Sequence, residues 1–397
     1  MRLHIGKPYI SVDNEVKKAR LNFWLTYPGG GYELYYEVEN QYKKYLTVEL
    51  SDAAIVCVLL YAMERNWDIE CEGNISERLY NQLNKYLIPA ISRNISRYSL
   101  ISVIAKTSNE SFEGKAVGTG LSCGVDSFYT VLKSLDYPNS SPLRLTHCCF
   151  FNSGSTGFWG GAKARTLYEK RMERFQRVGQ ELGCEFLACD SNMTEFLLQE
   201  NEMTHVFRTL SIPLALQKLF SSYYFASTYP FENFKFTDFD PSYYDILTLT
   251  MLSTQNIRFE LVGAETSRLG KVKYLADYEI TYHNLHVCIT DEYNCGHCRK
   301  CLRTMLDFYL IGKLNCYSDV FDLNFFNSHL NRIFIWALLN FWRVDMPEIV
   351  GALLKQHKVH IIHIIAAIMI LPFYYVKVVA GKIQFKFSIK MKKGKCR

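Results

Sequence analysis

Residues 122–127 have the clearest potential for chemistry in this sequence, because they lie between an apolar run and a helical run. They are Ser122, Cys123, Gly124, Val125, Asp126 and Ser127. Such a turn can aim successive backbone amides, together with the positive end of the following helix, at an anion such as phosphate. The two serines would add hydroxyl groups, and Asp126 could cap the helix or help to hold magnesium. The sequence therefore predicts a phosphate-binding loop.

The loop is not a Walker loop, because the pattern G-x-x-x-x-G-K-[ST] is absent from the chain. The observed pattern S-x-G-x-D-S resembles instead the signature S-G-G-x-D-S of the PP-loop ATP pyrophosphatase superfamily. Enzymes of that superfamily cleave ATP between its α and β phosphates and transfer AMP to a substrate oxygen. Cys123 stands where glycine is usual, and a positive φ at that position would cost about 1 kcal/mol.

A second group of residues suited to chemistry is a set of cysteines with the spacing C-x6-C-x2-C-x2-C. The set consists of Cys288, Cys295, Cys298 and Cys301. A tight turn would present three thiolates to one ion, and the preceding strand would supply the fourth. A closed tetrahedral sulfur site of this kind suits structural zinc, and an iron–sulfur cluster is the chemical alternative. His297 lies within the cluster and is taken as a bystander.

The loop and the cysteines, in this order, resemble the 7-cyano-7-deazaguanine synthase family of the queuosine pathway and its relatives. Residues 294–303 are similar to the metal segment of that family, approximately C-G-x-C-x-x-C-x-x-R, and residues 266–271 are similar to its lysine segment. The resemblance covers roughly residues 115–308 and implies that Lys271 neutralises pyrophosphate. Arg299 and Lys300 replace the usual Asp-Ser, so the resemblance implies the class of reaction and not the deazapurine substrate.

The implied reaction is that of an ATP-dependent ligase: AMP transfer to a carboxylate or another oxygen, pyrophosphate release and attack by a nitrogen nucleophile. Asp126 and Lys271 are the predicted catalytic residues, with ATP, magnesium and zinc as cofactors and a small-molecule acceptor as substrate. A sulfur-transferring enzyme acting on RNA is the alternative, and it would need a persulfide cysteine. Another alternative is a catalytically inactive nucleotide-binding protein. Three further ionisable residues stand near predicted element ends: Glu265, Asp190 and His205.

The elements that must position these residues follow from the apolar patterns. Strands are predicted over residues 21–27, 32–38, 116–121, 143–151, 185–189 and 258–262, and helices over 52–65, 76–87, 126–135 and 163–182. Pro89 interrupts the helical pattern, and residues 107–114 read as a linker. From residue 115 strands and helices alternate, which favours a parallel sheet with ligands beyond the carboxyl ends of its strands.

The predicted fold class is α/β, with three domains. Residues 1–113 form an N-terminal α+β domain, residues 114–310 form a parallel-sheet PP-loop domain of the adenine nucleotide alpha hydrolase-like type, and residues 311–397 form a helical extension with a basic tail. Nothing in the sequence assigns a role to the first domain or identifies the acceptor.

Composition sets the remaining expectations. The chain of 397 residues is 49% hydrophobic, carries a formal charge of +6 and contains thirteen cysteines without an N-terminal signal-peptide pattern, so a reducing, cytoplasmic location is expected. Residues 361–376 are apolar but shorter than the usual span of about 20 residues. These residues and the lysines that follow them predict at most peripheral, salt-sensitive contact with a membrane. Nucleic-acid binding stays open, and a homodimer is compatible with the sequence.

Overall fold

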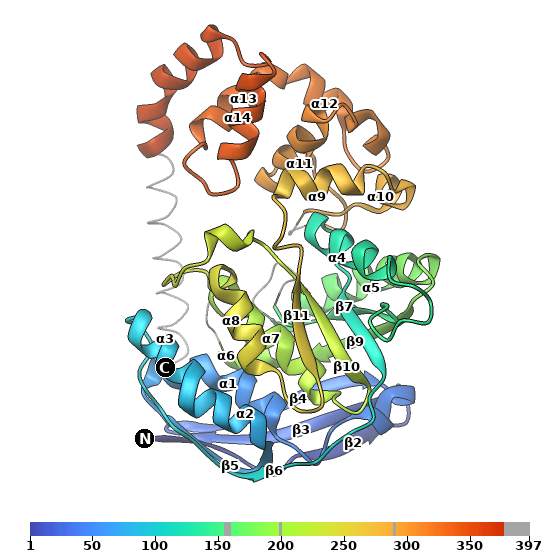
Figure 1. Cartoon of the computed structure of the whole chain (residues 1–397), viewed down its shortest axis with the longest axis vertical. Coiled ribbons are helices and arrows are strands. Elements are labelled where there is room, and N and C mark those ends of the chain that lie inside the picture. Colours follow the sequence, from blue (N-terminus) through green and yellow to red (C-terminus); the bar gives the residue numbers. More distant parts are fainter. Residues whose placement is uncertain (155–159, 198–200, 289–290, 377–397) are drawn as a thin grey trace. The chain divides into compact units, whose positions relative to one another are not determined.

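The computed structural model describes residues 1–154, 160–197, 201–288 and 291–376 (Figure 1). Contacts group the chain into two units, a first that contains residues 1–275 and a second that contains residues 293–397. The first unit is an α/β structure, and the described part of the second is helical. The predicted α/β class with a helical C-terminal region is therefore confirmed.

One sheet of eleven strands organises the first unit, in the order β11-β10-β7-β8-β9-β4-β3-β1-β5-β6, with β2 paired to β3. The strands are β1 (Arg2–Ile5), β2 (Tyr9–Asp13), β3 (Lys18–Tyr27), β4 (Gly30–Glu39), β5 (Asp68–Ser76), β6 (Val103–Ser108), β7 (Ala116–Gly120), β8 (His147–Phe151), β9 (Glu185–Ser191), β10 (Phe220–Ala226) and β11 (Arg258–Val262). Six of the ten pairings are parallel, so the sheet is mixed and mostly parallel.

The strands of residues 1–113 continue the sheet of the later residues. The connection is antiparallel pairing between β4 and β9, where Tyr36 faces Ser191 and Glu37 faces Asp190. The predicted boundary at residue 113 thus falls between β6 and β7, two strands of the same sheet. The division of the chain into domains at residue 113 stays a prediction.

Helices occur in both units. They are α1 (Asp52–Arg65), α2 (Glu77–Gln82), α3 (Ile88–Asn94), α4 (Val125–Leu135), α5 (Gly161–Glu181), α6 (Met193–Leu197), α7 (Asn201–Ala215), α8 (Asp245–Leu252), α9 (Arg268–Leu275), α10 (Glu279–Asn284), α11 (Arg299–Leu310), α12 (Leu323–Ser328), α13 (Leu330–Leu339) and α14 (Pro347–Lys355). Residues 361–376 are also helical. None of the helices within these described residues is long and apolar enough to cross a bilayer.

Helix α1 lies in the core, since every residue from Asp52 to Met63 is buried. A helix that is apolar on all sides is expected to be covered on all sides. Its one buried carboxylate, on Asp52, accepts hydrogen bonds from the backbone amide of Ser76 at 2.8 Å and from the side-chain amide of Gln217 at 2.9 Å. These bonds tie the start of α1 to the end of β5 and to the segment between α7 and β10.

The predicted break at Pro89 is wrong. The chain stays helical from α2 through a π turn, Leu83–Leu87, into α3, where proline occupies the first turn. Proline has no amide hydrogen to donate to the preceding turn, and the π turn that ends at Leu87 marks an irregularity of the helix directly before it.

Candidate functional site

The loop of residues 122–127 connects β7 to α4, the strand-to-helix turn that its sequence predicts. Gly124 is the N-terminal cap residue of α4 and has an extended backbone, and no side chain caps the helix. The backbone carbonyl of Cys123 accepts a hydrogen bond from the amide of His286 at 2.8 Å, which anchors the turn. The positive end of an eleven-residue helix is thus held at the carboxyl edge of the sheet.

Cys123 is buried and has a φ of 55°, in the left-handed region that favours glycine. The turn therefore holds Cys123 at a positive φ, which costs about 1 kcal/mol for a residue with a Cβ. Burial raises the pKa of the Cys123 thiol far above its usual range, although the charge of Arg174 partly opposes the shift. The thiol is thus neutral and packs as a small apolar group.

A pair of substitutions at Cys123 tests this backbone requirement. Cys123→Gly should keep the melting temperature within about 2 °C of wild type, because relief of the strained φ offsets the lost packing. Cys123→Val should cost about 1 to 3 kcal/mol, because a β-branched residue is disfavoured at this φ. Thermal unfolding of both variants measures the difference. Equal melting temperatures would contradict a left-handed residue 123.

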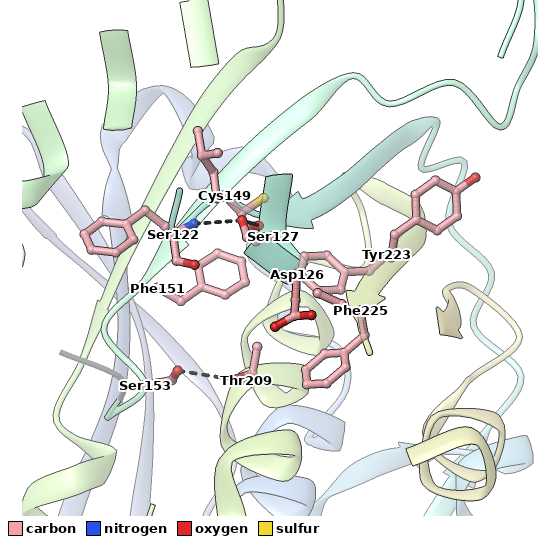
Figure 2. Close-up of a pocket in the computed structure, with 14 residues that line it drawn as sticks. Ser122, Asp126, Ser127, Cys149, Phe151, Ser153, Thr209, Tyr223 and Phe225 are labelled. Atoms are coloured by element: carbon pink, nitrogen blue, oxygen red, sulfur yellow. Dashed lines mark hydrogen bonds between the residues drawn. The ribbon is translucent and has the colours of Figure 1, made fainter. Parts of the chain in front are cut away.

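The Ser127 side chain is engaged within the loop. Its hydroxyl donates to the Gly120 carbonyl at 2.8 Å and accepts a bond from the Ser122 amide at 3.0 Å (Figure 2). Ser122 is exposed, and its hydroxyl accepts a long bond from the Gly124 amide at 3.4 Å. Ser127 therefore fixes the shape of the turn, while Ser122 presents its hydroxyl to solvent.

Asp126 and Lys271 are brought together, although they lie 145 residues apart. The Lys271 ammonium donates to the Asp126 carboxylate at 2.8 Å and to the Ser227 carbonyl at 2.5 Å, and the lysine side chain is only 2% exposed. The Arg268 guanidinium lies 3.6 Å from the same carboxylate. Two cationic groups on α9 thus stand beside the first turn of α4.

Gly263 makes room for the buried lysine. A Cβ on this residue would lie 3.0 Å from the Lys271 Cε and 3.1 Å from the Tyr129 ring, and its φ of 90° also favours glycine. The following Glu265 accepts bonds from the Tyr129 hydroxyl at 2.7 Å and from the Gly263 amide at 3.0 Å. Burial alone would raise the pKa of Glu265, but these bonds and the charge of Lys271 hold it below its usual value. Glu265 is thus an anion that helps to position Tyr129 and Lys271.

A cavity of about 230 Å³ opens beside the loop at the carboxyl ends of β7, β8 and β10. It is lined by Gly120, Leu121, Ser122, Asp126, Ser127, Cys149, Phe150, Phe151, Ser153, Thr209, Tyr223, Tyr224, Phe225 and Ala226. The Asp126 carboxylate and the rings of Phe151 and Phe225 face its interior (Figure 2). Opposite the loop, the hydroxyls of Ser153 and Thr209 lie 3.3 Å apart. The cavity can therefore hold a flat, mostly apolar group with the phosphate loop at one side.

The four predicted metal ligands form a cluster. The Sγ atoms of Cys288, Cys295, Cys298 and Cys301 all lie within 4.8 Å of one another. Four thiolates about 2.3 Å from one zinc ion would be about 3.8 Å apart, and two of the observed separations are 3.5 and 4.0 Å. An iron–sulfur cluster would hold the thiolates further apart, because a core of iron and sulfide separates them. The residues thus fit one tetrahedral metal ion.

The local backbone supports thiolate ligands at this cluster. The amide of Cys298 donates to Cys295 Sγ at 3.3 Å, and the amide of Cys301 donates to Cys298 Sγ at 3.5 Å. Gly296 has a φ of 75°, which permits the tight turn. The prediction that a strand supplies Cys288 is wrong, because residues 285–288 have no regular structure. Their place is fixed instead by Arg171, whose guanidinium donates to the Cys288 carbonyl at 3.3 Å.

Other residues singled out in the sequence lie elsewhere or serve structural contacts. Asp190 accepts from Arg165 at 3.0 Å and from the side-chain amide of Asn152 at 2.6 Å. The His205 ring shares a hydrogen bond of 3.1 Å with the Ser242 hydroxyl. Neither Asp190 nor His205 lines the cavity.

Sequence reasoning missed several residues of the site. Arg268 lies within the segment 266–271, and its position three residues before Lys271 on one helix could have indicated a second cation on the same face. Tyr129, Thr209 and Phe225 carry no motif, and only the folding of α4, α7 and β10 around the loop reveals them.

Comparisons with models of protein families, with curated proteins and with solved structures found no match for this chain. The functional argument therefore rests on the residues and geometry of the site.

Proposed function

We propose that this protein is an ATP-dependent ligase that activates a carboxylate or another oxygen of a small molecule by AMP transfer. The observation that carries the proposal is the convergence of four features at one end of α4. These features are the uncapped N-terminus of α4, the Asp126 carboxylate of the S-x-G-x-D-S loop, the buried Lys271 ammonium that donates to it, and the cavity beside the loop.

Each feature suits one part of the proposed reaction. The amides at the start of α4 would bind phosphate oxygens, and Lys271 and Arg268 would neutralise the charge that develops on departing pyrophosphate. Asp126 offers a partly exposed carboxylate, and magnesium in nucleotide sites is commonly held by one or two carboxylates plus phosphate oxygens. Magnesium would stabilise the same developing negative charge.

The chemistry balances in two steps. The acceptor oxygen forms a bond to the α phosphorus of ATP, and the bond from that phosphorus to the bridging oxygen breaks, so pyrophosphate leaves with the electron pair. A nitrogen nucleophile then attacks the activated carbon, loses a proton, and AMP departs. The cavity would bind a flat part of the nucleotide or of the acceptor.

The cysteine cluster would have a structural role in this scheme. Four sulfur ligands complete a tetrahedral zinc site and leave no position open for a substrate. Every cysteine in the described ranges is free of disulfides, which suits the reducing, cytoplasmic location proposed for the enzyme.

The geometry gives less support to sulfur transfer onto RNA. That reaction needs an accessible cysteine that forms a thiolate easily. The available cysteines, Cys123, Cys148 and Cys149, are all buried. Burial raises the thiol pKa of Cys123 and Cys149, and a hydrogen bond with Cys184 together with burial raises that of Cys148.

Product analysis tests the proposal directly. The purified protein should convert ATP to AMP and pyrophosphate when the correct carboxylate and an amine or ammonia are present, with mass spectrometry identifying the products. AMP should appear in a one-to-one ratio with pyrophosphate. Release of ADP and phosphate would contradict cleavage between the α and β phosphates. ATP binding without turnover across a broad acceptor panel would favour the inactive nucleotide-binding alternative.

A further inference from the structure

The helix of residues 361–376 exposes an unusual amount of apolar surface. It contains no charged residue under the ordinary assignment of neutral histidine. Ten of its apolar side chains are between 43% and 79% exposed: Ile361, Ile362, Ile365, Ile368, Met369, Ile370, Leu371, Phe373, Tyr375 and Val376. A helix on the surface of a globular protein normally places charged and polar groups there. We therefore expect a binding partner to bury this apolar surface.

Only a narrow stripe of the helix faces its own unit. His363 and Ala367 are buried, and the His363 ring bonds the Asn331 side chain at 3.0 Å. Further along, the Tyr374 hydroxyl donates to the Asn340 side chain at 3.0 Å. These contacts orient the helix on α13 and leave the remaining apolar sides outward.

The charge of the surrounding sequence limits what can cover this surface. After Glu348 the chain contains no acidic residue, but it carries ten lysines and arginines. These are Lys355, Lys358, Lys377, Lys382, Lys386, Lys390, Lys392, Lys393, Lys395 and Arg397, of which those after Val376 lie outside the described residues. A second copy of the chain would bring two such basic segments together, and like charges oppose that pairing. An anionic lipid surface attracts the cations and accepts the apolar side chains.

The dimensions of the helix favour a position along the membrane surface. The uncharged run of residues 361–376 ends at Lys377, and as a helix it extends about 24 Å, less than the hydrocarbon core of about 30 Å. Tyrosine and tryptophan are enriched at the boundary between lipid and water, and Tyr375 of this helix is exposed.

We propose that the helix of residues 361–376 docks this protein on anionic membrane surfaces, parallel to the bilayer and assisted by the basic residues that flank it. The apolar side chains insert among the acyl chains near the headgroups, and the lysines pair with acidic lipid. This inference is independent of the proposed ligase reaction, since it uses no residue of the loop or of the cavity.

Vesicle co-sedimentation of the full chain tests the proposal. The protein should bind phosphatidylcholine vesicles that contain phosphatidylserine about tenfold more tightly than vesicles of phosphatidylcholine alone, and high salt should release it. The double substitution Ile365→Asp/Ile368→Asp should weaken binding to the anionic vesicles by about tenfold or more. The matched control is Val16→Asp/Leu100→Asp, which places the same two new charges on apolar residues that are 61% and 67% exposed and lie outside this helix. It should bind like wild type.

Three results would overturn the proposal. One is equal binding of the Ile365→Asp/Ile368→Asp variant and wild type. Another is a lipid-free dimer that this double substitution converts to monomer, seen by light scattering, in a protein that ignores anionic vesicles. The last is protein that remains in cell membranes through high salt and alkaline carbonate, which would show insertion rather than surface docking. Thermal unfolding of the variant, measured in parallel, reports whether it is folded.

Discussion

Asp126→Ala is expected to lower the rate of AMP formation from ATP by about thirtyfold to a thousandfold, or about 2 to 4 kcal/mol of transition-state stabilisation. The carboxylate lies at the first turn of α4, accepts from Lys271 at 2.8 Å and faces the cavity. Its removal takes away the proposed magnesium ligand and the group that positions the lysine. The initial rate of AMP formation at saturating ATP measures the effect.

Asp136→Ala provides a matched control on the same helix. Asp136 follows the last residue of α4, and its exposed carboxylate accepts from the Tyr274 hydroxyl at 2.7 Å. The same substitution there should leave AMP formation within about twofold of wild type, because surface changes away from a site have small effects. Because Asp126→Ala leaves the Lys271 charge buried without its carboxylate, its melting temperature must be measured alongside the rate.

Combining Asp126→Ala with Ser127→Ala should abolish turnover. Ser127 joins the Gly120 carbonyl to the Ser122 amide, so its loss also loosens the turn. A double variant that is folded and forms AMP at the wild-type rate would show that this loop does not bind the reacting phosphates.

Local patterns predicted much of the fold. The apolar runs at 21–27 and 32–38 lie within the hairpin strands β3 and β4, and α1 and β11 have the predicted bounds. These elements could be predicted because the spacing of apolar side chains along a short stretch of sequence indicates a helix or a strand. Strand β10 was missed, since its run Phe-Ser-Ser-Tyr-Tyr-Phe-Ala begins only five residues after the last residue of α7 and its apolar and polar residues do not alternate.

The long-range arrangement could not be predicted in the same way. Pairing of β4 with β9 joins Tyr36 to Ser191, and neither strand carries a local signal for its neighbour. The joining of all eleven strands into one sheet could therefore be seen only in the structure.

The candidate site was predicted where a motif identified it. The loop and the cysteine cluster came from residue spacing, and Lys271 came from family resemblance. The apolar lining of the cavity could not be predicted from the sequence. Phe151 lies at the end of β8 and Phe225 near the end of β10, and these two strands are on opposite sides of β7, an order that no local pattern indicates. The sequence indicated that a positive φ at Cys123 would cost free energy, but only the structure shows that Cys123 has a positive φ.

Cys298→Ser is expected to remove the bound zinc and to lower the melting temperature of the protein by about 5 °C. The wild-type chain should contain one zinc ion, measured by elemental analysis of purified protein. Cys298 caps the N-terminus of α11 as well as offering a ligand, since its Sγ accepts from the Cys301 amide. Loss of about 4 kcal/mol would account for the shift, because metal binding to a folded site contributes directly to folding.

Cys316→Ser is the matched control, because Cys316 is an exposed free cysteine outside the cluster. It should retain one zinc ion and the wild-type melting temperature. A chelator should lower the melting temperature of wild type and of Cys316→Ser, and leave Cys298→Ser unchanged. Acidification should release the metal, because the four ligands must be thiolates to bind it. Iron and inorganic sulfide in place of zinc, or a Cys298→Ser protein that keeps both its metal and its melting temperature, would show that the four sulfur atoms do not form a structural zinc site.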